Sequence, residues 1–217
     1  MKSFDIVIIG GGIVGSAVAY FLARTGRAGK VAVIEPDPSY ACSATPTANG
    51  GVRQLFSLPE NILMARYGLE FFAEFHGVMA IDGAPADIGF KRRGYLFISD
   101  DGGHAQMEAN YRLQESLGAR VDMLDGNALA ARFPSLNVTD VALAVHAPDD
   151  AWVNPHAALM GFRDKARWLG VDYVEDRVVD WRAGGNLARD VVLASGATLA
   201  ATASCSPPAP GRAKSAP

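Results

Sequence analysis

The sequence predicts an α/β fold: a parallel sheet covered on both faces, with an inserted α+β segment interrupting it. Two continuous apolar runs, 4–9 and 30–37, are short and rich in β-branched residues, which is typical of buried parallel strands. Residues 13–25 lie between them, have helical length and end at Gly26. The pattern changes after residue 82 and returns after Pro155, which indicates the insertion.

The next two stretches differ in regularity. Residues 38–57 show no periodicity, and a long stretch of this kind inside a compact domain is usually functional or disordered. Pro59 then opens a predicted helix over 59–75, because proline suits the first helical position. Apolar residues recur along it at helical spacing. They are Ile62, Ala65, Leu69, Phe72 and Phe75.

The segment after residue 82 mixes strands and helices. We expect a strand over 90–99, a polar amphipathic helix over 104–118, and a strand followed by a turn over 141–154. The first pattern then resumes with a helix over 155–170 and strands over 171–181 and 189–196. The predicted divisions are a first domain over 1–82, an insertion over 83–154, a return to the first domain over 155–201, and a disordered low-complexity tail over 202–217.

Composition excludes several classes of protein. The 217 residues, 49% of them hydrophobic, can bury a sizeable core, and the net charge of −3 lacks the basic excess of nucleic-acid-binding domains. The apolar run at 6–9 is too short to span a membrane. Cys42 and Cys205 make no disulfide framework, so we expect a cytoplasmic protein. The four histidines lack metal-ligand spacing, and no metal is expected.

A glycine motif follows the first predicted strand. Gly10, Gly12 and Gly15 fit G-x-G-x-x-G, which predicts a dinucleotide site when a strand precedes it and a helix follows. The first glycine allows the tight turn, the second lets a pyrophosphate approach the backbone, and the third lets the helix pack close to the sheet. The free N–H groups at the start of the helix then favour an anion.

Glu35 ends the second predicted strand, 25 residues after Gly10. A carboxylate near this offset accepts hydrogen bonds from the two hydroxyls of a ribose, and it favours a ribose without a phosphate. NAD and the adenosine half of FAD both fit this requirement. From the motif alone, the choice between the two cofactors is open.

An ordered set of segments resembles one known family. The segments "IVIIGGGIVGSAVAYFLA…VAVIEPD", "ATPTANGGVRQLFS", "KRRGYLFIS" and "DDAWVNPHAALMGFRDKARWLGVDY" resemble the FAD-dependent amino-acid and amine oxidoreductases of the D-amino-acid oxidase group. The similarity is strongest to the branch of glycine oxidase, sarcosine oxidase and dimethylglycine dehydrogenase, and it extends to about Ala200. It implies a Rossmann-like FAD-binding domain built from 1–82 and 155–201, with 83–154 as part of a substrate domain.

The resemblance also implies which residues contact FAD. Ser43, Ala44 and Thr45 would meet the pyrophosphate, the next glycine-rich segment would run under the isoalloxazine ring, and the backbone of Val178 would meet the adenine. Asn49 departs from the Ala or Gly expected there. The full set of implied FAD-binding residues is Gly10, Gly12, Ile13, Val14, Gly15, Glu35, Pro36, Ser43, Ala44, Thr45, Asn49, Gly50, Gly51 and Val178.

The implied reaction is the oxidation of a small amino acid or N-methylated amine. A hydride passes from the carbon next to nitrogen to the flavin, and oxygen or an electron-transfer partner reoxidises it. Arg53 is the candidate catalytic residue, because a fixed cation near the ring stabilises reduced flavin or orients an anionic substrate. The alternatives are an NAD-dependent dehydrogenase and a non-catalytic dinucleotide-binding remnant.

The C-terminal tail departs from the family pattern. The family carries a buried strand and a small-residue turn after position 200, whereas this chain has "ATASCSPPAPGRAKSAP". Shifting the frame of the reverse-translated tail gives "DRVVLAAGAWAG", which fits that pattern. The hypothesis is a frameshift near 199–202, real or a sequencing error, leaving a truncated chain. Without its last strand, the protein would bind FAD weakly or not at all and be inactive; the alternative is a genuine short protein with a flexible tail.

Overall fold

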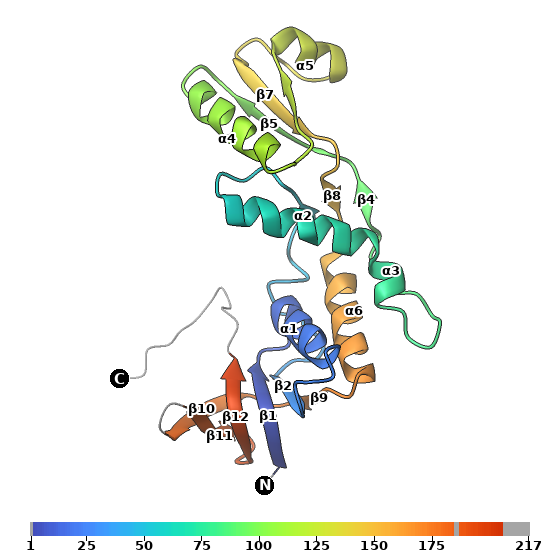
Figure 1. Cartoon of the computed structure of the whole chain (residues 1–217), viewed down its shortest axis with the longest axis vertical. Helices are drawn as coiled ribbons and strands as arrows, with labels where there is room; N and C mark the ends of the chain where they lie inside the picture. The colour runs from blue at the N-terminus through green and yellow to red at the C-terminus, as the bar shows by residue number, and fades with distance from the viewer. Residues whose placement is uncertain (1, 185–186, 206–217) are drawn as a thin grey trace. The chain divides into compact units, whose positions relative to one another are not determined.

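The computed structural model describes residues 2–184 and 187–205 (Figure 1). It divides the chain into two compact units. Unit 1 comprises Met1–Asn49, Met79–Ile88 and Pro155–Pro217, and unit 2 comprises Gly50–Val78 and Gly89–Asn154. The sequence placed residues 50–78 with the first domain, whereas the structure groups them with the inserted segment.

Unit 1 contains a six-stranded sheet with the order β10-β11-β12-β1-β2-β9. The neighbours from β12 through β1 and β2 to β9 are parallel, and β10 and β11 add an antiparallel edge. The parallel sheet confirms the predicted α/β class. The strands are β1 (Lys2–Ile9), β2 (Val31–Glu35), β9 (Asp172–Glu175), β10 (Val178–Gly184), β11 (Leu187–Leu193) and β12 (Thr198–Cys205); the helices are α1 (Ile13–Ala23) and α6 (Pro155–Trp168).

Both faces of this sheet are covered. Val7 and Ile8 are consecutive on β1, so their side chains point to opposite faces, yet both are fully buried. On one face α1 packs against α6, with the rings of Tyr20 and Phe162 5.8 Å apart. On the other face Val7 joins a core cluster that includes residues of β11 and β12 such as Val191. Burial on both sides explains the continuous apolar runs in the sequence.

The prediction that the sheet lacks its last strand is wrong. The residues Thr198–Cys205 form β12, which pairs with β1 from Leu199 opposite Lys2 to Cys205 opposite Ile8. A backbone ladder needs no particular side chain, so the alanine-, threonine- and serine-rich segment can fill the place of an apolar strand. Four residues of the predicted disordered tail, 202–205, therefore lie in the sheet. The remaining residues, 206–217, lie outside the described part of the chain.

Unit 2 is built from two small antiparallel sheets and four helices. One sheet has the order β5-β7-β6 and the other β3-β8-β4. The sequence did not predict β6 and α5, which are too short to show a clear period. The strands are β3 (Gly51–Val52), β4 (Lys91–Arg92), β5 (Tyr95–Ser99), β6 (Asp122–Leu124), β7 (Leu143–Ala147) and β8 (Ala151–Trp152); the helices are α2 (Pro59–Ala73), α3 (Phe75–Val78), α4 (His104–Ser116) and α5 (Gly126–Arg132).

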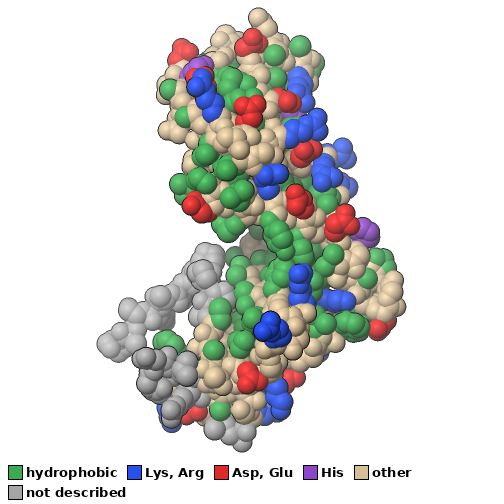
Figure 2. Space-filling view, viewed as in Figure 1, with side chains coloured by type: hydrophobic (Ala, Val, Ile, Leu, Met, Phe, Trp, Pro, Cys, Tyr) green, Lys and Arg blue, Asp and Glu red, His purple; other side chains and the backbone are tan. Residues whose placement is uncertain are grey.

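Helix α2 has one buried face and one exposed apolar face. Ile62 and Leu69 are buried, and Ile62 belongs to a core cluster with Val145 of β7. Leu63 and Met64 are at least half exposed, and apolar side chains gather on the surface around α2 (Figure 2). The helical spacing in the sequence therefore identified the buried face of α2 correctly.

Candidate functional site

The three glycines of the motif form a tight bend between β1 and α1. Gly10 has a φ of +98°, a conformation that L side chains rarely adopt, and its N–H donates to the Ile34 carbonyl at 2.8 Å. A Cβ on Gly15 would lie 1.9 Å from the Gly10 carbonyl oxygen. A Cβ on Gly12 would meet only Thr45 Oγ1, at 3.9 Å. The third glycine is thus required by packing, whereas the second faces open space.

Glu35 lies directly beside this bend. Its Oε2 accepts a hydrogen bond from the Gly11 N–H at 2.7 Å, and its Oε1 accepts one from the Asp37 N–H at 2.9 Å. Both are charge-assisted bonds, which are the stronger kind. The carboxylate at the end of β2 is therefore held next to the first turn of α1, where the ribose beside a bound diphosphate would lie.

The loop after β2 reaches the same end of α1. The Thr45 hydroxyl accepts a long hydrogen bond, 3.4 Å, from the Ile13 N–H in the first turn. The Ser43 hydroxyl is buried and has no hydrogen-bond partner among the residues that the structure describes. Such a group is costly unless something pairs with it. An open glycine and a helix N-terminus that the Thr45 hydroxyl meets together fit an anionic diphosphate.

The sequence did not reveal a buried hydroxyl chain behind the bend. The Ser16 hydroxyl donates to the Gly11 carbonyl at 2.7 Å and accepts from the Tyr173 hydroxyl at 3.1 Å. Burial raises the pKa of Tyr173 above its ordinary value, so this phenol is a neutral donor. Ser16 is fully buried inside α1 and fixes the carbonyl of the bend. Its position on the buried face of a helix was the available signal.

We expect Ser16→Ala to lower the free energy of unfolding by about 1–3 kcal/mol, because it leaves the buried Gly11 carbonyl unpaired. Chemical denaturation monitored by circular dichroism measures this loss. Ser3→Ala on the exposed start of β1 is the matched control and should change little. A Ser16→Ala protein as stable as the wild type would show that the chain does not support the bend.

The other implied FAD contacts of unit 1 occupy varied positions. Ile13 begins α1, and Val14 is 52% exposed on its first turn. Pro36 and Ala44 are exposed. Val178 begins β10, pairs with Leu193 and packs against the apolar cluster of the sheet. An ordinary role for Val178 as a strand residue accounts for these contacts, and its meeting with adenine stays a prediction.

Unit 2 holds the two glycines implied to run under the flavin ring. The Gly50 carbonyl accepts from the Val153 N–H at 2.9 Å, and Gly51–Val52 pair with β8. A Cβ on Gly51 would lie 1.7 Å from the Tyr95 hydroxyl oxygen, so only glycine fits without rearrangement. Gly50 has a φ of +80°. The segment is therefore fixed by a short ladder rather than being a free turn.

Arg53, the candidate catalytic residue, follows that segment. Its guanidinium carbon lies 5.1 Å from the ring centre of Phe56 and 5.4 Å from that of Phe97. It lines two cavities within unit 2, one of about 430 Å³ and one of about 610 Å³. The exposed cation held between two rings could meet an anionic ligand in either cavity.

Asp150 is the buried acid that the sequence did not reveal. The sequence predicted a turn after the strand in 141–154, and the chain does turn at 148–149, but Asp150 itself is fully buried. Burial raises its pKa to about 6 and neighbouring Asp149 raises it too, while hydrogen bonds from Gln54 and the charge of Arg53 act against this rise. The apolar stretches flanking the acidic pair were the only sequence signal of burial.

This raised pKa predicts a pH dependence of stability. The folded chain binds the proton on Asp150 more tightly than the unfolded chain, whose pKa is 3.8. Protonated Asp150 therefore makes its full contribution to the free energy of unfolding below pH 3.8. This contribution, roughly 3 kcal/mol, is lost as the pH rises through about 6. Melting temperatures between pH 4 and 8 should show this loss in the wild type and not in Asp150→Asn. Parallel profiles of the two proteins would contradict it.

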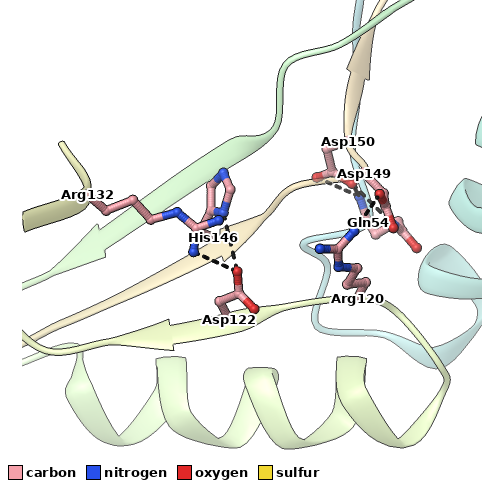
Figure 3. Close-up of polar contacts among 7 residues, drawn as sticks. All are labelled: Gln54, Arg120, Asp122, Arg132, His146, Asp149 and Asp150. Carbon is pink, nitrogen blue, oxygen red and sulfur yellow. Dashed lines mark hydrogen bonds and ion pairs between the residues drawn. The ribbon is translucent and has the colours of Figure 1, made fainter. Parts of the chain in front are cut away.

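His146 forms a second polar cluster, also in unit 2 (Figure 3). Its Nδ1 lies 3.7 Å from the Asp122 carboxylate, which also pairs with Arg132 at 2.8 Å. Burial lowers the pKa of His146, and Arg132 lowers the pKa of Asp122. The Arg132–Asp122 ion pair links α5 to β6, and the His146 ring packs edge-on against Phe133, 5.5 Å between centres.

The glycine bend, the adjacent carboxylate and the loop that meets them agree with the comparisons to known proteins. A family model described as "FAD dependent oxidoreductase" matches residues 5–214. The chain belongs to the FAD-dependent oxidoreductase family. The predicted family and its cofactor, FAD, are thereby confirmed, while the individual contacts to FAD stay predictions.

This chain matches only part of the length of its relatives. The chain is 36% identical over 179 residues to "FAD-dependent oxidoreductase domain-containing protein 1" of Bos taurus, which is 80% of this chain and 37% of that protein. Its structure is similar to that of L-proline dehydrogenase from P. horikoshii, with a TM-score of 0.82 and 24% sequence identity. The match covers 94% of this chain and 52% of the dehydrogenase. This chain likewise matches 54% of glycine oxidase from Bacillus cereus, at 26% identity and a TM-score of 0.75.

The chain therefore spans about half the length of these solved structures and 37% of the bovine relative. Both solved structures share the fold of 94% of this chain. Across the part of the chain that the structure describes, no helix combines the length and hydropathy needed to cross a bilayer.

Proposed function

We propose that unit 1 binds the ADP half of FAD. The N–H groups around Gly12 and Ile13 would hold the diphosphate, Glu35 would accept from the ribose hydroxyls, and Ser43 with Thr45 would complete the anion site. The observation that carries this proposal is the Glu35 carboxylate beside the bend, 2.7 Å from the Gly11 nitrogen. On binding, this carboxylate would exchange a backbone donor for ribose hydroxyls.

We propose that unit 2 contributes the flavin-ring contacts and a cation. FAD, when bound, supplies the acceptor for a hydride from carbon. Gly50 carries no Cβ and would let the backbone come close to a flat ring, whereas the Cβ space of Gly51 is taken up by the Tyr95 hydroxyl. Arg53 would stabilise negative charge on the reduced ring or orient a carboxylate of the substrate. No acid–base triad is needed, since positioning and electrostatics suffice.

We propose a small amino acid or N-methylated amine as substrate for the whole protein. Glycine oxidase and L-proline dehydrogenase, two relatives by fold, are named for such substrates. The exposed Arg53 cation at the cavities of unit 2 suits the carboxylate of an amino acid. Oxygen or an electron-transfer partner would receive the electrons, in the cytoplasm. An NAD-dependent dehydrogenase and a non-catalytic remnant are the alternatives to this proposal.

One experiment separates these possibilities. The purified chain is titrated with FAD and, separately, with NADH, and the FAD-loaded chain is mixed anaerobically with glycine, proline or sarcosine. Because β12 is present in the sheet, we expect flavin absorbance that follows the protein through gel filtration, whereas bleaching by an amine would contradict the predicted inactivity of this chain. Bound FAD without bleaching would support the remnant, and bound NADH alone would support the dehydrogenase.

A further inference from the structure

The Asp150 carboxylate accepts three hydrogen bonds from Gln54, the residue that follows Arg53. The Gln54 N–H donates to both carboxylate oxygens of Asp150, at 3.0 and 3.1 Å. The Gln54 side-chain Nε2 donates to Oδ1 at 3.0 Å. Both residues are at least 95% buried and are 96 positions apart in the chain (Figure 3). Buried charge-assisted bonds of this kind hold one geometry firmly.

The backbone at Asp150–Trp152 also makes hydrogen bonds to residues near Arg53. Its carbonyl accepts from the Gly94 N–H at 2.9 Å, at the start of β5. The next two residues form β8, which pairs with Gly51–Val52. The segment Gly50–Gln54 is therefore fixed twice, by a ladder at its start and by the Asp150 carboxylate at its end.

A buried carboxylate is an expensive way to hold a turn. Removing a carboxylate from water costs several kcal/mol, and apolar residues of similar volume often stabilise a fold as well or better. What the carboxylate offers is acceptance of several donors at once, which fixes the peptide between Arg53 and Gln54 and so the direction in which Arg53 leaves the backbone. This favours a role in positioning over one in stability.

We propose that Asp150 is a positioning residue for the flavin-ring segment. Its carboxylate holds Gly50–Gln54 so that the glycine backbone and the Arg53 cation meet the ring in one arrangement. The proposal rests on the proposed function, in which this segment contacts FAD. Asp150 itself touches neither cofactor nor substrate and acts through Gln54.

The test compares Asp150→Ala, Asp150→Asn and Gln54→Ala with Asp149→Asn as the matched control, since Asp149 is adjacent, has a side chain 42% exposed and pairs with Arg120 rather than with Gln54 (Figure 3). The readouts are the Kd for FAD, the shape of the bound flavin absorption bands, and hydrogen exchange of peptides 50–54 and 143–147 in the cofactor-free chain. We expect Asp150→Ala to raise the Kd at least about tenfold and to change the bands.

The other variants should weaken FAD binding by smaller amounts. Asp150→Asn should stay within about threefold of the wild-type Kd, because its oxygen still accepts from the Gln54 N–H and the Gln54 amide can flip to pair with its NH₂. Gln54→Ala loses one bond only and should weaken FAD binding about threefold to tenfold. Asp149→Asn should change nothing. Exchange should rise about tenfold in peptide 50–54 of Asp150→Ala and stay unchanged in 143–147.

The outcomes separate this proposal from the function on which it rests. Wild-type Kd, bands and exchange in Asp150→Ala would overturn the positioning role and leave the proposed function standing. A folded wild-type chain that binds no FAD would remove the proposed function, and exchange would still show whether Asp150 holds the segment. Should Asp150→Ala not fold, Gln54→Ala decides: a wild-type Kd and exchange rate there overturn the proposal.

Discussion

Gly12→Ala should bind FAD at least about tenfold more weakly than the wild type, while it folds almost normally. A Cβ at this position meets only Thr45 Oγ1, at 3.9 Å, so the cofactor-free fold has room for it. The same Cβ occupies the space through which a diphosphate would reach the helix N-terminus, and crowding of this kind costs about 1–3 kcal/mol. Titration of the variant with FAD, followed by flavin fluorescence, measures the effect.

Gly15→Ala is the contrasting variant. Its Cβ would lie 1.9 Å from the Gly10 carbonyl oxygen, so α1 must move away from β1 and stability should fall by about 3 kcal/mol. Thermal melts should therefore separate the two glycines: a small change for Gly12→Ala and a large one for Gly15→Ala. Equal losses of stability and binding in both would mean that the motif is a structural turn only.

Glu35→Gln should weaken FAD binding by roughly tenfold to a hundredfold. A charged hydrogen bond is worth about 1.5–3 kcal/mol, and a ribose with two donor hydroxyls would lose charged acceptors in the variant. The amide keeps one oxygen for the Asp37 or the Gly11 N–H and loses the other charge-assisted bond, so stability should also fall by about 1–3 kcal/mol, and the Kd is measured on the folded variant. Equilibrium titration with FAD and with ADP, which shares the ribose, checks the prediction.

Glu175→Gln supplies the matched control for Glu35. Glu175 is directly opposite Glu35 in the parallel ladder, at the end of β9, but its side chain is exposed. Its change should leave the affinity for FAD and ADP unchanged. An equal loss in both variants would indicate a general electrostatic effect, and no loss in Glu35→Gln would remove the carboxylate from the site.

Local sequence was sufficient for the glycine bend and the main strands of unit 1. Each glycine of the motif has a steric requirement that the sequence displays directly, and burial on both sheet faces produces apolar runs that are easy to recognise. The position of Glu35 follows as well, because it ends the neighbouring parallel strand. These features depend on residues that are close together in the chain.

Long-range contacts were beyond local patterns. The bonds from Gln54 to Asp150 span 96 positions, and the bond from Tyr173 to Ser16 spans 157, so no periodicity reports them. β12 was missed for a different reason: Leu199 is its one large aliphatic residue, so its apolar signal is weak, although Leu199 and Ala201 are buried in the core and backbone pairing with β1 forms the strand. The grouping of residues 50–78 with the inserted segment was also missed, because it depends on the pairing of Gly51–Val52 with β8, about 100 positions away in the chain.

A crystal structure of this chain with bound ADP tests the central claim most directly. We expect diphosphate oxygens within hydrogen-bond distance of the N–H groups at Gly12 and Ile13, a ribose hydroxyl that donates to Glu35, and a hydrogen-bond partner for the Ser43 hydroxyl. Two results would contradict the proposed site. One is ADP bound elsewhere on unit 1, and the other is bound ADP whose ribose does not contact Glu35 while Glu35 still accepts from the Gly11 and Asp37 N–H groups.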